Sequence, residues 1–102
     1  MTNNRVTQEE ISALMNAAET QEHTFWDKEI IVSYKFPCGF TIAGRSACVD
    51  PANFNLEIGR QLARKDAESQ LWRLEGYRKQ LEMADAINRK AKADELRKGL
   101  YQ

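Results

Sequence analysis

The spacing of apolar side chains predicts a short helix near the start of the chain. Apolar residues recur there at intervals of three and four, which places them on one side of a helix: Ile11, Leu14, Met15 and Ala18. Thr7 stands where a helix N-cap is expected, and Glu10 follows three residues later, as in a capping box. We therefore predict a helix over 7–20.

The stretch over 21–28 reads as a connection, yet it holds two large aromatic residues, Phe25 and Trp26. Side chains of this size contribute strongly to cores and interfaces. We interpret the pair as an anchor that fixes the connection to the core. The alternative is an exposed aromatic pair that contacts a partner.

Alternation of residue types predicts a β-hairpin over 29–47. The first strand places β-branched and aromatic residues on one face: Ile30, Val32, Tyr34 and Phe36. Pro37, Cys38 and Gly39 supply turn chemistry, and Gly44 in the second strand indicates a bulge or the close approach of another backbone. Because two strands alone are marginal in water, the hairpin must pack on helices or join a second copy.

A long amphipathic helical region is predicted over 51–98. Asp50 and Pro51 are the favoured residues for an N-cap and a first helical position. Apolar residues then recur mostly in steps of three and four: Phe54, Ile58, Leu62, Ala67, Leu71, Leu74, Tyr77, Leu81, Ala84, Ile87 and Ala91. We favour a helix kinked or broken near Gly76. The alternative is one straight helix of about 72 Å, too long to bury its stripe within one chain.

These elements make an α+β fold: an N-terminal helix, a two-stranded antiparallel hairpin and a long C-terminal helix. A chain of 102 residues has room for one domain, so we predict a single small domain over 1–102. The hairpin and first helix offer too little surface to cover the whole stripe of the long helix. We therefore predict a homo-oligomer, a dimer or larger.

Charge excludes some classes of function. The chain has fifteen basic residues (Lys and Arg together) and fifteen acidic residues (Asp and Glu together). This balance disfavours both a polybasic nucleic-acid binder and an acidic nucleic-acid mimic. Residues 51–102 nevertheless carry a balance of +3, and the basic residues concentrate over 89–102. We read this stretch as a solvated helical tail, with nucleic-acid binding as the alternative. The longest apolar run, Ile30 to Val32, is far shorter than a membrane-spanning helix requires.

The residues that carry chemistry do not form a catalytic or metal-binding motif. Two cysteines, Cys38 and Cys48, and the single histidine, His23, lack the number and spacing of a zinc site. No phosphate-loop, dinucleotide or nucleophile-elbow motif occurs. We expect no metal, no cofactor and no enzymatic activity.

One basic cluster near the predicted helix start is a candidate anion site. Its members could bind a phosphate beside the helix N-terminus: Arg45, Asn53, Arg60, Arg64 and Lys65. The alternative is solvated charge, paired with acidic neighbours such as Glu57, Asp66 and Glu68. We interpret Asp50 and Pro51 as structural caps.

Several segments between Gly39 and Tyr77 resemble a family of small phage proteins named for products of phages N4 and Sf6. The segments are G-F-x-x-x-G-x-S-A-C from Gly39, D-P-A-N-F from Asp50 and L-E-G-Y from Leu74. Alone each is common, but in this order they are specific, and the resemblance covers about residues 7–81. It implies a setting in the host bacterial cytoplasm and an accessory role, without any catalytic residue to carry over.

Three hypotheses of function follow. The first is a non-enzymatic accessory protein that binds a host or defence protein and modulates or inhibits it. The second is an oligomeric protein that sequesters a small anionic ligand, such as a nucleotide immune signal. The third is nucleic-acid binding through the basic C-terminal helix.

Overall fold

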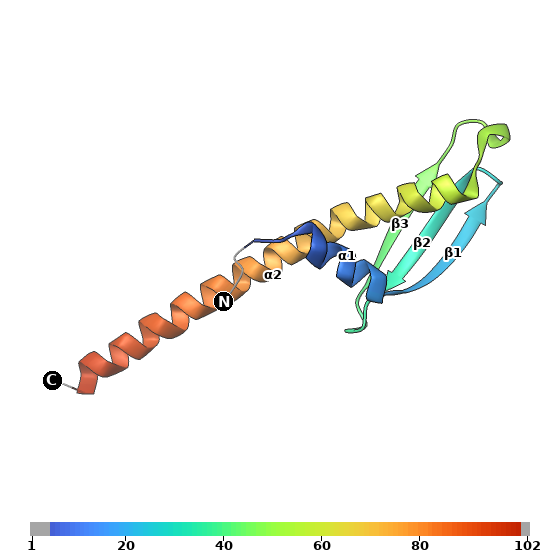
Figure 1. Ribbon diagram of the computed structural model, residues 1–102. Helices are drawn as coiled ribbons and strands as arrows, with labels where there is room; N and C mark the ends of the chain where they lie inside the picture. Colours follow the sequence, from blue (N-terminus) through green and yellow to red (C-terminus); the bar gives the residue numbers. More distant parts are fainter. Residues whose placement is uncertain (1–4, 101–102) are drawn as a thin grey trace.

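The computed structural model describes residues 5–100 (Figure 1). The molecule is elongated, with extents of 77 × 21 × 21 Å. A small antiparallel sheet lies at one end, and one long helix crosses it and continues far beyond it (Figure 1). In chain order the elements are α1 (Gln8–Ala17), β1 (Glu19–Phe25), β2 (Glu29–Lys35), β3 (Thr41–Ala47), the 3₁₀ turn η1 (Pro51–Asn53) and α2 (Leu56–Leu100).

The predicted first helix is confirmed, although it is shorter than expected. The Thr7 hydroxyl accepts a hydrogen bond from the Glu10 amide at 3.2 Å, which is the expected N-cap. The Glu10 carboxylate pairs with Lys79 of α2 at 2.9 Å and also accepts a hydrogen bond from the Thr7 backbone, as expected of a capping box, and both contacts lower the pKa of that carboxyl. The helix ends at Ala17 rather than at residue 20, since the chain turns there into a strand.

The sheet has three strands in the order β1-β2-β3, so the prediction of a two-stranded hairpin is wrong. The additional strand, β1, occupies most of the stretch that was expected to be a connection. It pairs with β2 antiparallel from Glu19 opposite Lys35 to Phe25 opposite Glu29. Its sequence, ETQEHTF, lacks an apolar alternation because β1 is an edge strand with no helix packed closely on it.

The core lies between α2 and one face of β2 and β3, with α1 alongside. It consists of Ile11, Met15, Ile30, Val32, Tyr34, Phe36, Ile42, Ala63, Ala67 and Leu71. Gly44 is where α2 comes closest to the sheet, because a Cβ on Gly44 would lie 1.9 Å from the Ala63 carbonyl oxygen. The expected close approach at Gly44 is thus confirmed, and the β2–β3 turn follows the prediction, with Gly39 at φ +96°.

Helix α2 runs without interruption through Gly76, so the expected kink or break there is wrong (Figure 1). A glycine inside a helix costs only about 1 kcal/mol relative to alanine, which the flanking turns readily offset. At 1.5 Å per residue, α2 is about 68 Å long. The other alternative, one straight helix, is therefore the observed one.

The start of α2 also differs from the prediction of a helix from residue 51. The Asp50 side chain accepts from the Ala52 amide at 3.0 Å and caps only η1, in which Pro51 is the first residue. The long helix begins after η1, where the Asn55 side chain accepts from the Ile58 amide at 3.1 Å. Asn55 therefore has the capping role for α2 that was expected of Asp50.

Candidate functional site

The β1–β2 turn holds the most unusual backbone of the described residues. Trp26 and Asp27 have φ values of 51° and 49°, and the Lys28 amide donates to the Phe25 carbonyl at 3.1 Å. Two successive positive φ values are characteristic of the tight type I′ hairpin turn, which ordinarily uses Asn and Gly. Asp tolerates this conformation, whereas a bulky side chain such as Trp rarely adopts it.

Trp26 is not a core anchor, because its side chain is 80% exposed. It belongs to a row of three aromatic rings, here called the aromatic row: His23, Phe25 and Trp26. The Phe25 and Trp26 ring centroids are 5.8 Å apart, and His23 packs edge-on to Phe25 at 4.5 Å. The alternative interpretation of an exposed aromatic pair is therefore the better one for Trp26, while Phe25 is half-buried.

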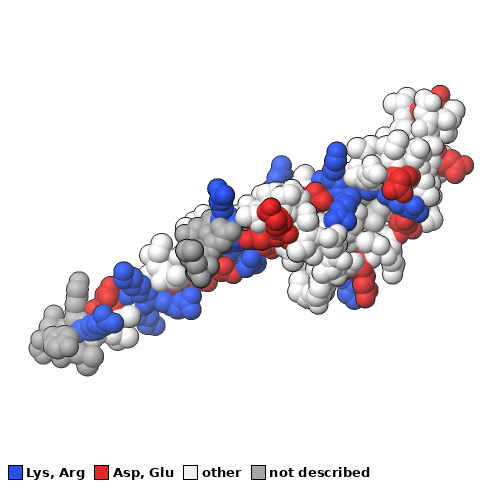
Figure 2. Space-filling view, viewed as in Figure 1, with Lys and Arg blue, Asp and Glu red and all other residues white. Residues whose placement is uncertain are grey.

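The aromatic row borders the face of the sheet that neither α1 nor α2 covers. Alternation along the strands puts His23 and Phe25 on the side opposite to α2, and His23 is paired in register with half-buried Ile31. At the same end of the sheet the Cys48 amide donates to the Lys28 carbonyl, and the next residue, Val49, is 96% exposed. In Figure 2 the end of the molecule where the strands and η1 meet is largely uncharged.

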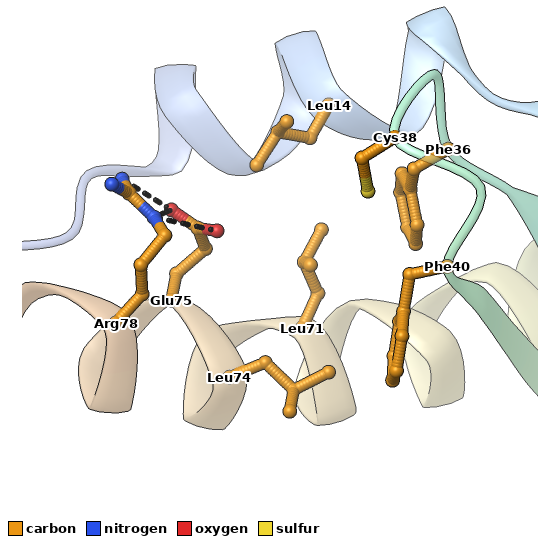
Figure 3. A pocket seen from close by; sticks show the side chains of 8 residues that line it. All are labelled: Leu14, Phe36, Cys38, Phe40, Leu71, Leu74, Glu75 and Arg78. Carbon is orange, nitrogen blue, oxygen red and sulfur yellow. Dashed lines mark hydrogen bonds and ion pairs between the residues drawn. The ribbon is translucent and has the colours of Figure 1, made fainter.

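A second apolar feature is a groove between α1, the β2–β3 turn and α2. Figure 3 shows aliphatic and aromatic side chains from all three elements turned toward a cavity of about 320 Å³. The salt-bridged pair Glu75 and Arg78 closes one end of this groove. Its apolar lining consists of Leu14, Phe36, Cys38, Phe40, Leu71 and Leu74.

The predicted anion site is not assembled within one chain. Arg45 lies on the uncovered face of the sheet and pairs with Glu29 at 2.5 Å. Arg60 lies on the opposite side, where it binds Glu22 of β1 at 2.9 Å, and these hydrogen bonds raise the pKa of the Arg60 guanidinium. The two guanidinium groups are thus separated by the sheet and engaged by carboxylates.

The other members of that predicted site are also dispersed. Arg64 donates to Glu68 at 3.1 Å and to Asn16 at 2.9 Å. The contact with Glu68 agrees with the alternative interpretation, in which the basic residues pair with acidic neighbours. Lys65 is exposed and makes no ion pair within the described part of the chain. Asn53 belongs to η1 and borders a small cavity with Phe54 rather than the arginines.

Among residues 5–97, no group of three or more His, Cys, Asp and Glu is arranged to hold a metal ion. Cys38 and Cys48 are free thiols, the first exposed and the second half-buried. No helix in the described part of the chain is both long enough and apolar enough to cross a membrane.

The sequence marked Phe25 and Trp26 as important residues, but the predicted role of a core anchor is wrong for Trp26. The signal that could have identified their exposure is the short spacing between Phe25 and Glu29, which leaves room only for a tight three-residue hairpin loop. Central residues of such a turn project away from the core. The place of Trp26 in the turn therefore exposes its side chain, even though Trp is a large apolar residue.

Fold and surfaces together define a small α+β protein whose apolar side chains are only partly covered by its own chain. The chain belongs to the phage protein family described as N4 Gp49/phage Sf6 gene 66, whose model matches residues 2–83. This match confirms the resemblance seen in the sequence, and the last part of α2 lies beyond it. No curated protein matches the chain, and no solved structure does.

Proposed function

We propose that this chain is a non-enzymatic phage accessory protein that binds a host or defence protein and so modulates or inhibits it. Its setting in this proposal is the host bacterial cytoplasm. The observation that carries the proposal is Trp26, a bulky exposed residue in a left-handed backbone conformation.

The energetic argument starts from the turn. A left-handed conformation costs a non-glycine residue about 1–2 kcal/mol, and exposing an indole ring in water adds no stability to the fold. Asn or Gly would form the same turn without that cost. Strained residues cluster where function requires them, so the arrangement favours a role for the indole ring outside the folded chain.

The surroundings of Trp26 suit a protein partner. Trp is enriched among the few residues that dominate binding energy at interfaces. Phe25 supports the indole from one side, and the uncovered sheet face beside it offers further apolar area at Ile31. A rim of polar groups, including the Glu29–Arg45 pair, surrounds this area as in other protein interfaces.

The decisive experiment compares Trp26→Asn with a control, Leu96→Asn, which removes an exposed apolar side chain from α2. Each protein is used to capture host proteins, and the retrieved partner is then purified and titrated. Trp26→Asn should melt at or above the wild-type temperature, because Asn accepts the left-handed turn. Loss of a central Trp costs about 2 kcal/mol or more, so the affinity should fall about thirtyfold or more.

The control should bind like the wild type. A partner that binds Trp26→Asn as tightly as it binds the wild type would remove the aromatic row from the proposal. If neither the wild type nor the control captures a specific partner from any host, the proposed function itself is contradicted.

A second candidate, sequestration of a small anionic ligand, is favoured by one observation on α2. Arg73, Lys90 and Lys92 make no ion pair within the described part of the chain, so their charges are available to a ligand. A second copy packed along α2 would bring two such sets together. Thermal shift with a panel of nucleotides tests this, since tight binding raises the apparent stability by several kcal/mol.

A further inference from the structure

Beyond the sheet, α2 carries a stripe, apolar except for Asn88, with the spacing of a coiled coil. The stripe, here called the distal seam, advances in alternating steps of three and four residues: Leu74, Tyr77, Leu81, Ala84, Asn88 and Ala91. Such steps average 3.5 residues, the repeat that keeps one stripe facing a partner helix. Every seam residue is exposed, Tyr77 by 66%.

We infer that the distal seam binds the distal seam of a second copy, with the two helices antiparallel. This inference concerns self-assembly and does not depend on which host partner the aromatic row binds. Three independent observations select the second copy and the direction of its helix: the sizes of the seam residues, the charges beside them, and the place of the sheet.

Residue size divides the seam into two complementary halves. Its first half holds Leu74, Tyr77 and Leu81, and its second half holds Ala84, Asn88 and Ala91. An antiparallel pair, centred between Leu81 and Ala84, sets each large residue against a small residue of the other copy. A parallel pair would instead place large against large at one end and small against small at the other, which leaves voids.

The layers on either side of the centre of the antiparallel pair also satisfy polar groups. In this register Leu74 faces the partner's Ala91, and Leu81 faces the partner's Ala84. Tyr77 faces the partner's Asn88, so a phenol hydroxyl and a carboxamide meet in the same layer. Both groups can donate and accept hydrogen bonds, which suits a partly buried position.

The charges that flank the seam also favour an antiparallel pair. In the antiparallel register the seam's edges place Arg78 near the partner's Asp85 and Arg73 near the partner's Asp94. In a parallel pair, Arg73 would instead lie near the partner's Arg78, a contact between like charges. Within its own chain Arg78 binds Glu75 and Glu82, and its five donors leave room for a further carboxylate.

The fold leaves this side of α2 accessible only beyond the sheet. The stripe continues toward the N-terminus of α2 as Ala67 and Ala63, both fully buried beneath β3 and its neighbours. A parallel pair would bring two sheets to the same end, whereas an antiparallel pair places them at opposite ends. From Leu74 to Ala91 the seam is about 27 Å long.

The first helix lies beside the start of the seam, where Leu74 also lines the groove next to α1, and it leaves the rest of the seam open. Helix α1 is tied to the far side of α2 through Lys79, whose Nζ donates to Glu10 at 2.9 Å and to the Arg5 carbonyl. Lys79 is two residues after Tyr77, so it points about 200° around the helix from it. The chain thus covers one side of α2 and leaves the seam open beyond Leu74.

Cross-linking tests the direction directly, in a Cys38→Ser, Cys48→Ser background that removes the two natural thiols. A Leu74→Cys copy is mixed with an Ala91→Cys copy that carries a longer tag, and a short bismaleimide is added. We expect a mixed dimer on a denaturing gel and no cross-link from Leu74→Cys alone. A Gly76→Cys control, placed away from the seam where a Cβ meets no atom within 4 Å, should not cross-link.

Cross-linking of Leu74→Cys with itself would overturn the antiparallel direction, and absence of any cross-link would overturn the seam. A second experiment exchanges charges instead of introducing cysteines, because a new cysteine could itself disturb the packing of the seam. Arg78→Glu should weaken self-association by about tenfold or more, and adding Asp85→Arg should restore it. Failure of that rescue would also contradict the antiparallel register, whereas Trp26→Asn should leave self-association unchanged.

Discussion

The two halves of α2 share one helix and one periodicity, yet they have opposite surroundings. Over 56–71 the buried stripe consists of the small residues Gly59, Ala63 and Ala67 and ends at Leu71. Over 74–97 the stripe includes larger residues such as Tyr77 and Leu81, and these are exposed. Burial along this helix therefore follows the extent of the sheet rather than the hydrophobicity of the side chains.

The small residues explain how the first half packs. Because Gly44 and Ala63 lack larger side chains, the backbones of β3 and α2 approach closely, and Gln70 of α2 also donates to the Ala43 carbonyl at 2.8 Å. Such an approach leaves no room for large residues. The second half, which has large residues, extends beyond the sheet and carries the self-association that we propose.

The strongest way to test this difference is to introduce a charge into each half. Leu71→Asp should prevent folding, because an unpaired carboxylate in the core costs several kcal/mol of a total stability of about 5–15 kcal/mol. Leu81→Asp should keep wild-type helicity and melting under conditions where the protein is monomeric. Circular dichroism melts check both; equal damage from the two changes would refute the division of α2.

A glycine in each half gives a second test. Gly44→Ala should destabilise the fold by about 3 kcal/mol, since its Cβ would overlap a backbone carbonyl that cannot rotate away. Gly76→Ala should stabilise it by about 0.5–1 kcal/mol, because nothing lies within 4 Å and alanine favours the helix. Chemical denaturation measures both, and a tolerated Gly44→Ala would contradict the close packing.

Capping provides a smaller effect at the start of the packed half. Asn55→Ala should cost about 1 kcal/mol, because it removes the acceptor of the Ile58 amide in the first turn of α2. Asp50→Ala should cost less, since Asp50 caps only the three-residue η1. A loss of about 1 kcal/mol lowers the melting temperature by about 4–8 °C, so melting temperatures distinguish the two variants. A larger loss in Asp50→Ala than in Asn55→Ala would show that Asp50 is the main cap.

The smallest effect concerns pH and the tie between α1 and α2. The hydrogen bond from Lys79 lowers the pKa of the Glu10 carboxyl, so ionised Glu10 favours the folded state. This stabilisation is present above the unfolded pKa of about 4.3 and is lost as the pH falls through the lower folded value. Lys79→Met should weaken the dependence of the melting temperature on pH in that acidic range. An unchanged dependence would show that the Glu10–Lys79 pair is not its source.

The sequence predicted the elements that have local signals. The first helix has its cap at Thr7 and its apolar stripe, and β2 has a clean alternation that ends in a glycine turn. Gly44 was recognised as either a bulge or a close approach, because a glycine inside a strand has few other uses, and the close approach is the one observed. The family was recognised from motifs that extend through these same elements.

The missing elements lack such signals for physical reasons. β1 is polar on the side where Glu22 meets Arg60, and its other side is uncovered, so no apolar alternation marks it. The continuity of α2 through Gly76 follows from the surrounding turns, which no single residue reveals. Arg45 and Arg60 were grouped in one predicted anion site, but their separation by the sheet and their pairing with carboxylates depend on strand register.

The central claim, that the second half of α2 is an assembly surface, is tested most directly by molar mass in solution. Sedimentation equilibrium at micromolar concentration should give at least twice the 11.7 kDa of one chain for the wild type. Leu81→Asp, folded and equally helical, should give 11.7 kDa. A wild-type mass of one chain, or an unchanged assembly for Leu81→Asp, would contradict the account.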